Sequence, residues 1–358
     1  SGHQFGHFNP HLGDGRAHLL GELKDSNGDL LDIQLKGSGI TDFSRQGDGR
    51  CALGPALREF IMSEAMYALN VPTSRTLAVV ATGEQVYRNT MQPGAVVTRV
   101  ASSHIRVGTF QYFAVRRNND ALKKLLDYTI NRHYPTINIE QDDYILQFLQ
   151  QTIDKQIELV VAWLRVGFIH GVMNTDNCAI SGETIDFGPC AMMGSYHPGT
   201  VFSSIDHQGR YAFMNQANIV SWNMTRLAET LLSLIDEDTD KAIELVTPVL
   251  KGYADKFNRA YHQMMAEKLG LPQGHILPVE FLEALLEHMQ EQQLDYTITF
   301  NQLSNSFDDI DLQTKLSQSL GKYYATWRSL LNENAISDDD AKQLMNSVNP
   351  AVIPRNHH

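Results

Sequence analysis

Three oxygen-bearing side chains between residues 170 and 188 have types and spacing that suit chemistry on a phosphate group. Asn177 and Asp186 are nine residues apart, and hard cations such as Mg²⁺ bind a few such oxygens together with phosphate oxygens and water. Asp176 precedes Asn177 and is the nearest candidate for a general base. The alternative for Asp176 is a loop residue that only solvates a turn. We expect a metal-assisted reaction of a nucleotide at this segment.

The same segment has the spacing of the protein-kinase catalytic loop but lacks its catalytic aspartate. Kinases carry H-R-D-x-x-x-x-N followed by D-F-G, and the first Asp accepts the substrate proton. His170 and Asn177 occupy the matching positions and Asp186 begins a D-F-G sequence, whereas Val172 replaces the catalytic Asp. For His170 we expect a role in holding the loop rather than in proton transfer.

Two glycine-rich turns each end in an arginine. Gly13 and Gly15 in "HLGDGRAHL" would let the backbone approach phosphates closely, and Arg16 adds a fork-shaped donor. Asp48 and Gly49 in "SRQGDGRCALGP" come just before a predicted helix, where anions commonly bind. An ordinary hairpin turn and an ordinary capping turn are the alternatives, because a G-x-G sequence alone is a weak signal.

Four further charged residues are candidates for the same phosphate site. Lys36 ends an apolar strand and Glu59 lies on the following helix, the order in which kinases place a lysine–glutamate pair. The alternative is that both are exposed on unrelated surfaces. Arg99 and Arg106 stand among apolar residues, where an unpaired charge is costly. They are either structural ion-pair partners or, with Lys36, the cations that hold an extended triphosphate deep in a cleft.

The elements that must position these residues change type along the chain. Residues 10–102 are rich in short β-branched or alternating runs, interrupted by one helix at 55–70. From about 104 onward the pattern is mainly helical, with the longest run at 142–168. Within it, "GFIHG" and "CAISGETIDFG" read as short strands around a loop. This predicts an α+β, protein-kinase-like bilobal fold, with an N-lobe at 1–102 and a C-lobe at 103–358.

Bulk composition excludes several classes of protein. The chain has 358 residues and a formal charge of −12, from 29 Lys and Arg against 41 Asp and Glu, which argues against nucleic acid or an anionic membrane as the main partner. Cys51, Cys178 and Cys190 form no metal-binding spacing and are expected to be small core residues in a reducing cytosol. We see neither a signal peptide nor a transmembrane run.

Several longer motifs together resemble the selenoprotein O family. They include "SGHQFGHFNPHLGDGRA", "LKGSGITDFSRQGDGR", "LREFIMSEAMYALNVPTSR", "TRVASSHIRVGTFQYFA", "HGVMNTDN" and "IDFGPCA". The resemblance extends from residue 1 to the final "NPAVIPRNH". Members carry further sequence at both ends, including a C-terminal Cys or selenocysteine, so we expect this chain to be part of a longer protein.

The resemblance implies a kinase-like fold, sometimes classed as a pseudokinase, that binds ATP flipped relative to a kinase. AMP would then be transferred to Ser, Thr or Tyr hydroxyls of proteins, with Mg²⁺ or Mn²⁺, and UTP is a possible substitute for ATP. It implies Asp176 as proton acceptor, Asn177 and Asp186 as metal ligands, and Glu59 as the partner of Lys36. The implied nucleotide-binding residues are Gly13, Gly15, Arg16, Lys36, Asp48, Gly49, Arg99, Arg106 and Asp186. The expected location is the bacterial cytosol, or the mitochondrion if the source is eukaryotic.

Three functions therefore compete. The first is a protein adenylyltransferase. The second is a conventional kinase or small-molecule phosphotransferase, and the third is a nucleotide-binding scaffold without activity, which the valine at position 172 favours. The sequence does not name the target proteins, the preferred nucleotide, the metal or the oligomeric state.

Overall fold

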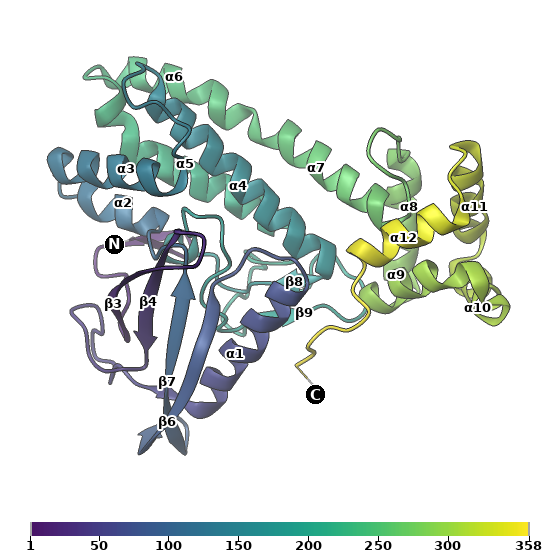
Figure 1. The fold of residues 1–358 in the computed structure, drawn as a ribbon, viewed down its shortest axis with the longest axis horizontal. Helices are drawn as coiled ribbons and strands as arrows, with labels where there is room; N and C mark the ends of the chain where they lie inside the picture. Colours follow the sequence, from purple (N-terminus) through teal and green to yellow (C-terminus); the bar gives the residue numbers. More distant parts are fainter. Residues whose placement is uncertain (1, 357–358) are drawn as a thin grey trace. The chain divides into compact units, whose positions relative to one another are not determined.

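The computed structural model describes residues 2–356 and combines an N-terminal antiparallel sheet with a long helical part. The sheet contains β3 (Ala17–Lys24), β4 (Leu30–Lys36), β5 (Cys51–Ala52), β6 (Arg75–Tyr87) and β7 (Met91–Ala101). β4 and β6 pair with opposite edges of β7, while β3 pairs with β4 and the short β5 with β7 (Figure 1). This α+β layout confirms the change from strands to helices that the sequence predicts.

Helix α1 (Leu53–Ala68) packs against β6 and β7. Its buried residues recur every three or four positions, as an amphipathic helix requires, and they include Ala56, Met62 and Met66. Glu59 lies on the same buried face, which is unusual for a carboxylate and requires a charged partner. The helix therefore carries this side chain into the interior beside the sheet.

The helices that follow are α2 to α12, and short 3₁₀ turns occur at Thr175–Asn177 and Ser306–Asp308. Their bounds are α2 (Val107–Ala114), α3 (Asn119–His133), α4 (Tyr144–Val166), α5 (Gln216–Ile235), α6 (Thr239–Lys251), α7 (Tyr253–Lys268), α8 (Val279–Glu291), α9 (Tyr296–Asn305), α10 (Ile310–Leu320), α11 (Lys322–Glu333) and α12 (Asp338–Val348). Within residues 2–356, no helix is both long and apolar enough to cross a bilayer.

Internal contacts divide the chain into two compact units. The first comprises Ser1–Leu159, Val172–Pro189 and Ala217–Tyr253, and the second comprises Val160–Gly171, Cys190–Gln216 and Ala254–His358. All candidate site residues belong to the first unit. The division into lobes at residue 102 stays a prediction.

The second unit has an apolar core that contains one lysine. Leu269, Phe300 and Trp327 are among its buried side chains. Lys268 is fully buried, and its Nζ donates hydrogen bonds to Arg165 O at 2.9 Å and Asn349 Oδ1 at 2.8 Å. Burial lowers the pKa of this amine well below its usual value.

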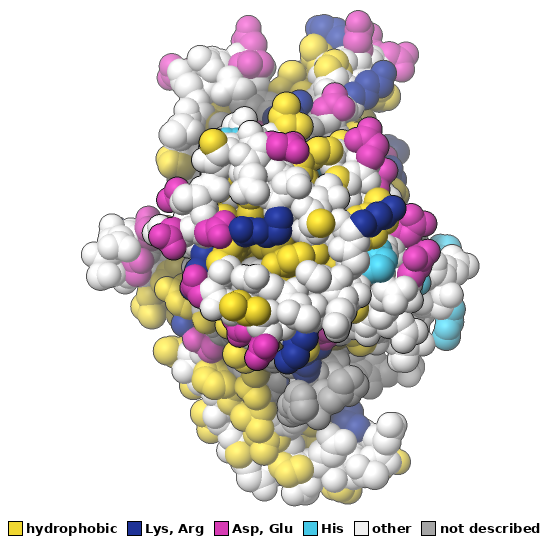
Figure 2. Space-filling view, turned by 90° about the vertical axis from the view of Figure 1, so that its right-hand side faces the viewer, with side chains coloured by type: hydrophobic (Ala, Val, Ile, Leu, Met, Phe, Trp, Pro, Cys, Tyr) yellow, Lys and Arg dark blue, Asp and Glu magenta, His cyan; other side chains and the backbone are white. Residues whose placement is uncertain are grey.

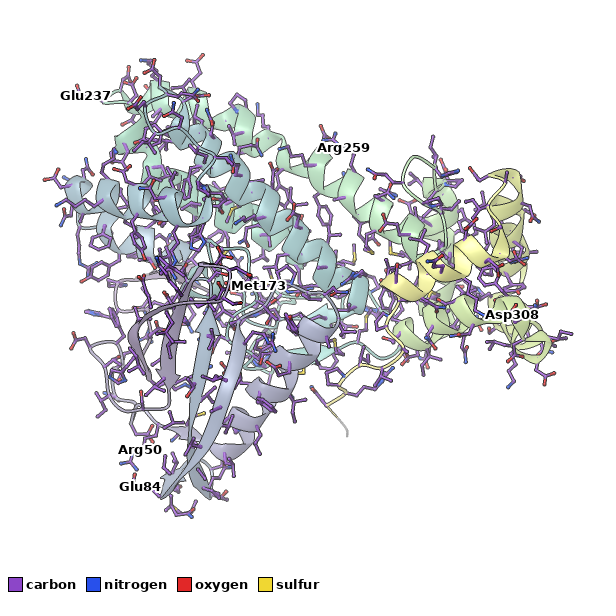
Figure 3. The ribbon with its side chains drawn as sticks, viewed as in Figure 1. Arg50, Glu84, Met173, Glu237, Arg259 and Asp308 are labelled. Carbon is purple, nitrogen blue, oxygen red and sulfur yellow. The ribbon has the colours of Figure 1, made fainter. Side chains whose placement is uncertain are left out.

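On the face shown in Figure 2, Lys and Arg side chains lie interspersed with Asp and Glu. In the C-terminal helices, Arg328 pairs with Asp338 at 2.9 Å, and Lys342 pairs with Asp308, which Figure 3 labels. Exposed pairs of this kind contribute little to stability.

Of the two short strands expected around the loop, the one within "GFIHG" is confirmed and the one at 178–188 was wrong. Residues 178–188 form only isolated bridges, Ala179 with Arg106 and Thr184 with Thr73, because positive φ angles at Gly182 and Asp186 interrupt an extended chain. The strand β8 (Phe168–Ile169) pairs instead with β9 (Ala191–Met192). The sequence analysis also missed a hairpin of β1 (Gly2–Gln4) and β2 (His7–Asn9) at the start of the chain.

Candidate active site

Strand β4 presents three polar side chains to one face of the sheet. Asp32, Gln34 and Lys36 alternate with apolar residues and are all buried, as expected when successive side chains point to opposite faces. The register of β4 with β7 places Arg99 directly opposite Gln34. The two central strands therefore set a row of polar groups into the interior of the first unit.

Lys36, Glu59, Arg99 and Asp186 form one ion cluster, in which Asp186 is partly exposed and the other three side chains are buried. Lys36 Nζ lies 2.6 Å from Glu59 Oε2 and also pairs with Asp186 Oδ1. Arg99 donates through Nε to Glu59 Oε1 at 2.9 Å and through Nη2 to Asp186 Oδ1 at 3.3 Å. Two cations thus share two carboxylates that come from the helix and from the D-F-G sequence.

The charges of this cluster stabilise one another against burial. Burial alone would raise the pKa of Glu59, but Arg99 and Lys36 hold it below its usual range. The same balance holds for Asp186, where burial is outweighed by Lys36 and Arg99, so its pKa lies far below the usual range. Both carboxylates are therefore ionised at neutral pH.

Gln34 connects this cluster to a second ion pair. Its Oε1 accepts a hydrogen bond from Arg99 Nη1 at 3.2 Å, and its Nε2 donates to Asp14 Oδ2 at 3.2 Å. Asp14 in turn binds both terminal nitrogens of Arg106, at 2.8 and 2.9 Å. Arg106 precedes α2, so one network runs from α1 through the sheet to the first helix of the helical part.

Asp176 lies within electrostatic reach of this second pair. Burial raises its pKa to about 6, Arg106 opposes the rise, and the negative charges of Asp186 and Asp14 add to it. Its Oδ1 is buried and has no hydrogen-bond partner within residues 2–356. A carboxylate with a pKa near 6 is ionised at neutral pH and is a stronger base than an ordinary aspartate.

A cavity of about 260 Å³ opens beside Asp176 and Arg106. Charged and polar groups share its lining with aromatic rings. The lining residues are Leu12, Gly13, Asp14, Phe43, His104, Arg106, Gly108, Thr109, Tyr112, Phe113 and Asp176. The cavity thus combines an apolar wall with two side chains of opposite charge, Arg106 and Asp176.

Gly13 and Gly15 are needed for packing in this structure. A Cβ at Gly13 would lie 2.8 Å from the Phe43 ring, and one at Gly15 would lie 2.9 Å from Phe43 O. Thr41 Oγ1 also donates to Asp14 O at 2.6 Å, so the turn is held against residues 41–44. These glycines allow the turn to pack closely against residues 43 and 44 of the protein itself. This packing fixes Asp14, which lies between the two glycines.

Arg16, Asp48 and Gly49 line a second, wider cavity of about 640 Å³. Asp48 is engaged there by Arg88, at 2.8 Å from Nη1 and 3.1 Å from Nη2. Arg50 also lines this cavity and forms an ion pair with Glu84, and both are labelled near the end of the β6–β7 hairpin in Figure 3. The loop at residues 13–16 lines both cavities, because Gly13 and Asp14 border the first and Gly15 and Arg16 border the second.

A hydrogen bond between its own residues helps to hold the loop that carries Asp176 and Asn177. Asn177 Nδ2 donates to Val172 O at 3.0 Å. His170 is buried, its backbone N–H donates to Gln216 Oε1 at 2.9 Å, and its ring lies 5.4 Å from that of Trp163.

The donor set fits a divalent cation bound together with a nucleotide. Asp186 is ionised, its side chain is about one-third exposed (34%), and Asn177 supplies a neutral oxygen. No group of three or more His, Cys, Asp and Glu within residues 2–356 forms a metal site on its own. Mg²⁺ commonly uses only one or two carboxylates and takes its other ligands from phosphates and water.

Sequence reasoning missed Asp14, Gln34 and Arg88. The alternation of Asp32, Gln34 and Lys36 in an otherwise apolar strand is a signal that could have revealed Gln34. Asp14 was missed because the glycines on either side of it were interpreted as a backbone loop for phosphates. The free cysteines Cys51, Cys178 and Cys190 are buried.

Comparison with known proteins identifies the family of the chain. A family model described as "Protein adenylyltransferase SelO" matches residues 1–358. The chain is 55% identical to "Protein nucleotidyltransferase YdiU" of Pseudoalteromonas translucida, over all of this chain and 74% of the relative. It is 51% identical to the protein of that name in Teredinibacter turnerae, over 74% of that relative, and 52% identical to that in Rhizobium rhizogenes, over 72%. The chain belongs to the SelO family.

Proposed function

We propose that this chain is a protein nucleotidyltransferase that moves AMP from ATP, or UMP from UTP, to Ser, Thr or Tyr hydroxyls of other proteins. Family membership supports the transferase class. The observation that carries the proposal is the network of Lys36, Arg99 and Arg106 beside Asp176, a carboxylate with a raised pKa. Cations for a polyphosphate and a base for a hydroxyl are thereby present in one unit.

The fold that would present this site is protein-kinase-like, with an N-lobe at 1–102 and a C-lobe at 103–358. Support for it is the antiparallel sheet with α1 packed against it, the Lys36–Glu59 ion pair, and a D-F-G sequence whose Asp joins that pair. The nucleotide lies flipped relative to a kinase, with its β- and γ-phosphates among Arg16, Lys36, Arg99 and Arg106. The α-phosphate then faces the acceptor.

The chemistry is one displacement at the α-phosphorus. The acceptor hydroxyl oxygen forms a bond to that phosphorus, the bond from phosphorus to the oxygen of the β-phosphate breaks, and pyrophosphate leaves. Asp176 takes the hydroxyl proton, a role that a pKa of about 6 permits at neutral pH. Asn177 and Asp186 would hold Mg²⁺ or Mn²⁺, which neutralises charge on the phosphates when bound.

This reaction asks the protein mainly for positioning and charge neutralisation. Val172 therefore does not exclude activity, because Asp176 lies four residues farther along the same loop. Gly13, Gly15, Asp48 and Gly49 shape the loops around the phosphates. We place the reaction in the bacterial cytosol.

Radiolabelled ATP distinguishes the three candidate functions. Protein that retains label from the α-phosphate but not from the γ-phosphate is expected. Label retained only from the γ-phosphate identifies a conventional kinase, and label from neither position identifies a scaffold. UTP labelled at the α-phosphate, assayed with Mg²⁺ and with Mn²⁺, then gives the preferred nucleotide and metal.

A further inference from the structure

The hairpin of β1 and β2 lies directly against the loop that carries Asp176. Its strands pair Gly2 with Asn9, His3 with Phe8 and Gln4 with His7. The hairpin also contacts α2, whose N-terminus is preceded by Arg106. A segment of eight residues at the start of the chain therefore joins two parts of the site, although nothing in the proposed reaction uses it.

Three hydrogen bonds close a ring between this hairpin, the loop and α2. The backbone N–H of His3 donates to Thr175 Oγ1 at 2.7 Å, and Thr175 Oγ1 donates to Gln111 Oε1 at 2.7 Å. Gln111 Nε2 lies 2.8 Å from His3 Nδ1 and completes the ring. Thr175 is fully buried, so its hydroxyl has to find both partners within the protein.

The packing of the ring leaves little space. A Cβ added to Gly2 would lie 2.6 Å from Thr175 Oγ1 and 3.1 Å from Leu12 Cδ2. The preceding loop residue is held as well, because Phe5 N–H donates to Asn174 Oδ1 at 3.4 Å. Two consecutive loop residues before Asp176 are thus fixed from the hairpin.

Asp176 depends on this support. Its Oδ1 has no hydrogen-bond partner in the described part of the chain, so no such bond orients that oxygen. The place of the carboxylate then depends on the backbone of the loop. Thr175 anchors this backbone to the hairpin and to α2, and bonds to Val172 O and Met173 O hold the residues before it. A shift of about 1 Å in a reacting group costs on the order of 10² in rate.

We propose that Thr175, bonded to His3 and Gln111, is a positioning residue that fixes Asp176, and that the β1–β2 hairpin belongs to the catalytic apparatus. This inference rests on the proposed function in one respect, namely that Asp176 accepts the hydroxyl proton.

The test compares Thr175→Val, which keeps the shape and removes both hydrogen bonds, with Thr175→Ser, which keeps the hydroxyl. We expect Thr175→Val to lower kcat by roughly 10–100-fold, with KM and Kd for ATP within about twofold of wild type. Thr175→Ser should recover most of the rate. Thr129→Val is the matched control, since the hydroxyl of this buried threonine donates to Leu125 O at 2.6 Å within its own helix, α3, and the variant should leave kcat unchanged.

A second readout does not depend on activity. Amide hydrogen exchange of residues 172–178, measured without nucleotide, should be faster in Thr175→Val than in wild type and unchanged in Thr129→Val. If wild type transfers no α-phosphate label, the proposed function fails, and exchange still decides whether the ring holds the loop.

Two results would overturn the inference. One is equal exchange in this loop for Thr175→Val and wild type. The other is a kcat for Thr175→Val equal to that of wild type, or a Thr175→Ser variant impaired as strongly as Thr175→Val.

Discussion

Replacing Glu59 by Gln removes the carboxylate that two buried cations share. Lys36 Nζ lies 2.6 Å from one of its oxygens, and Arg99 Nε lies 2.9 Å from the other. The Gln side chain keeps one acceptor for Arg99 but turns an amide donor toward Lys36, which has only donors to offer. Asp186 is then the only carboxylate of the cluster left for both cations.

The expected cost follows from burial. Side chains of Lys36, Glu59 and Arg99 are each no more than 6% exposed, so solvent cannot compensate the lost charge. Removing one partner of a buried ion pair typically costs about 3–5 kcal/mol. At about 2–4 °C per kcal/mol for a unit of this size, thermal unfolding of the first unit should shift down by roughly 6–20 °C at pH 7.

Acidification should reduce the difference in unfolding temperature between wild type and Glu59→Gln. Because Arg99 and Lys36 hold the pKa of Glu59 below its usual range, its stabilising contribution is complete above the ordinary Glu pKa of about 4.3. The contribution is lost as the pH falls through the lower folded value. Unfolding midpoints of wild type and Glu59→Gln should therefore converge on acidification below pH 4.

Thermal denaturation monitored by circular dichroism, with and without ATP and Mg²⁺, measures these effects. Nucleotide should raise the midpoint of Glu59→Gln by more than that of wild type, since phosphate oxygens can replace the missing anion. A variant that unfolds within 1–2 °C of wild type at pH 7, on the order of 0.5 kcal/mol, would refute the assignment of Glu59 as a shared counter-ion.

Other changes test the remaining residues. Asp186→Ala should abolish label transfer while far-ultraviolet circular dichroism stays native, and transfer at the normal rate would remove it as a metal ligand. Asp176→Ala should slow transfer by roughly 10²–10⁴-fold, and the wild-type rate should fall below about pH 6 as this base is protonated. Asp14→Asn should strengthen ATP binding measured by calorimetry, because the change frees Arg106 from its bidentate partner. Weaker binding would show that Asp14 does not compete with the nucleotide for Arg106. Burial lowers the pKa of Lys268, so the unfolded state binds one more proton than the folded state over part of the range from pH 7 to 10. The free energy of unfolding should therefore rise with pH in this range. The same free energy should depend less on pH in Lys268→Met.

Local sequence patterns were sufficient for the main elements of the fold. Helices α1 and α4 begin and end within two residues of the runs expected at 55–70 and 142–168. Residues 178–188 misled the strand prediction because their apolar and β-branched side chains say nothing about the positive φ angles at Gly182 and Asp186. The first hairpin was missed because three-residue strands are too short to show an alternation.

At the site, order along the chain indicated which charges could meet but not how they are shared. A lysine at a strand end and a glutamate on the next helix suggested the Lys36–Glu59 contact. That Arg99 would join it depends on the register of β4 against β7, which is set by long-range pairing. The contact of Asp14 with Arg106 spans 92 positions in the chain and has no local signature.

The proposed site carries balanced charges of its own, because Arg16, Lys36, Arg99 and Arg106 are matched by Asp14, Glu59, Asp176 and Asp186. Such a pocket has little net pull on a bare polyanion such as inorganic phosphate or citrate, since every incoming negative charge must displace one already in place. A nucleotide that binds together with divalent ions would differ from a bare anion, because the carboxylates that its phosphates displace from the cations would gain a new counter-ion. In the proposed reaction, uptake of the nucleotide and uptake of its ions would thereby be thermodynamically linked.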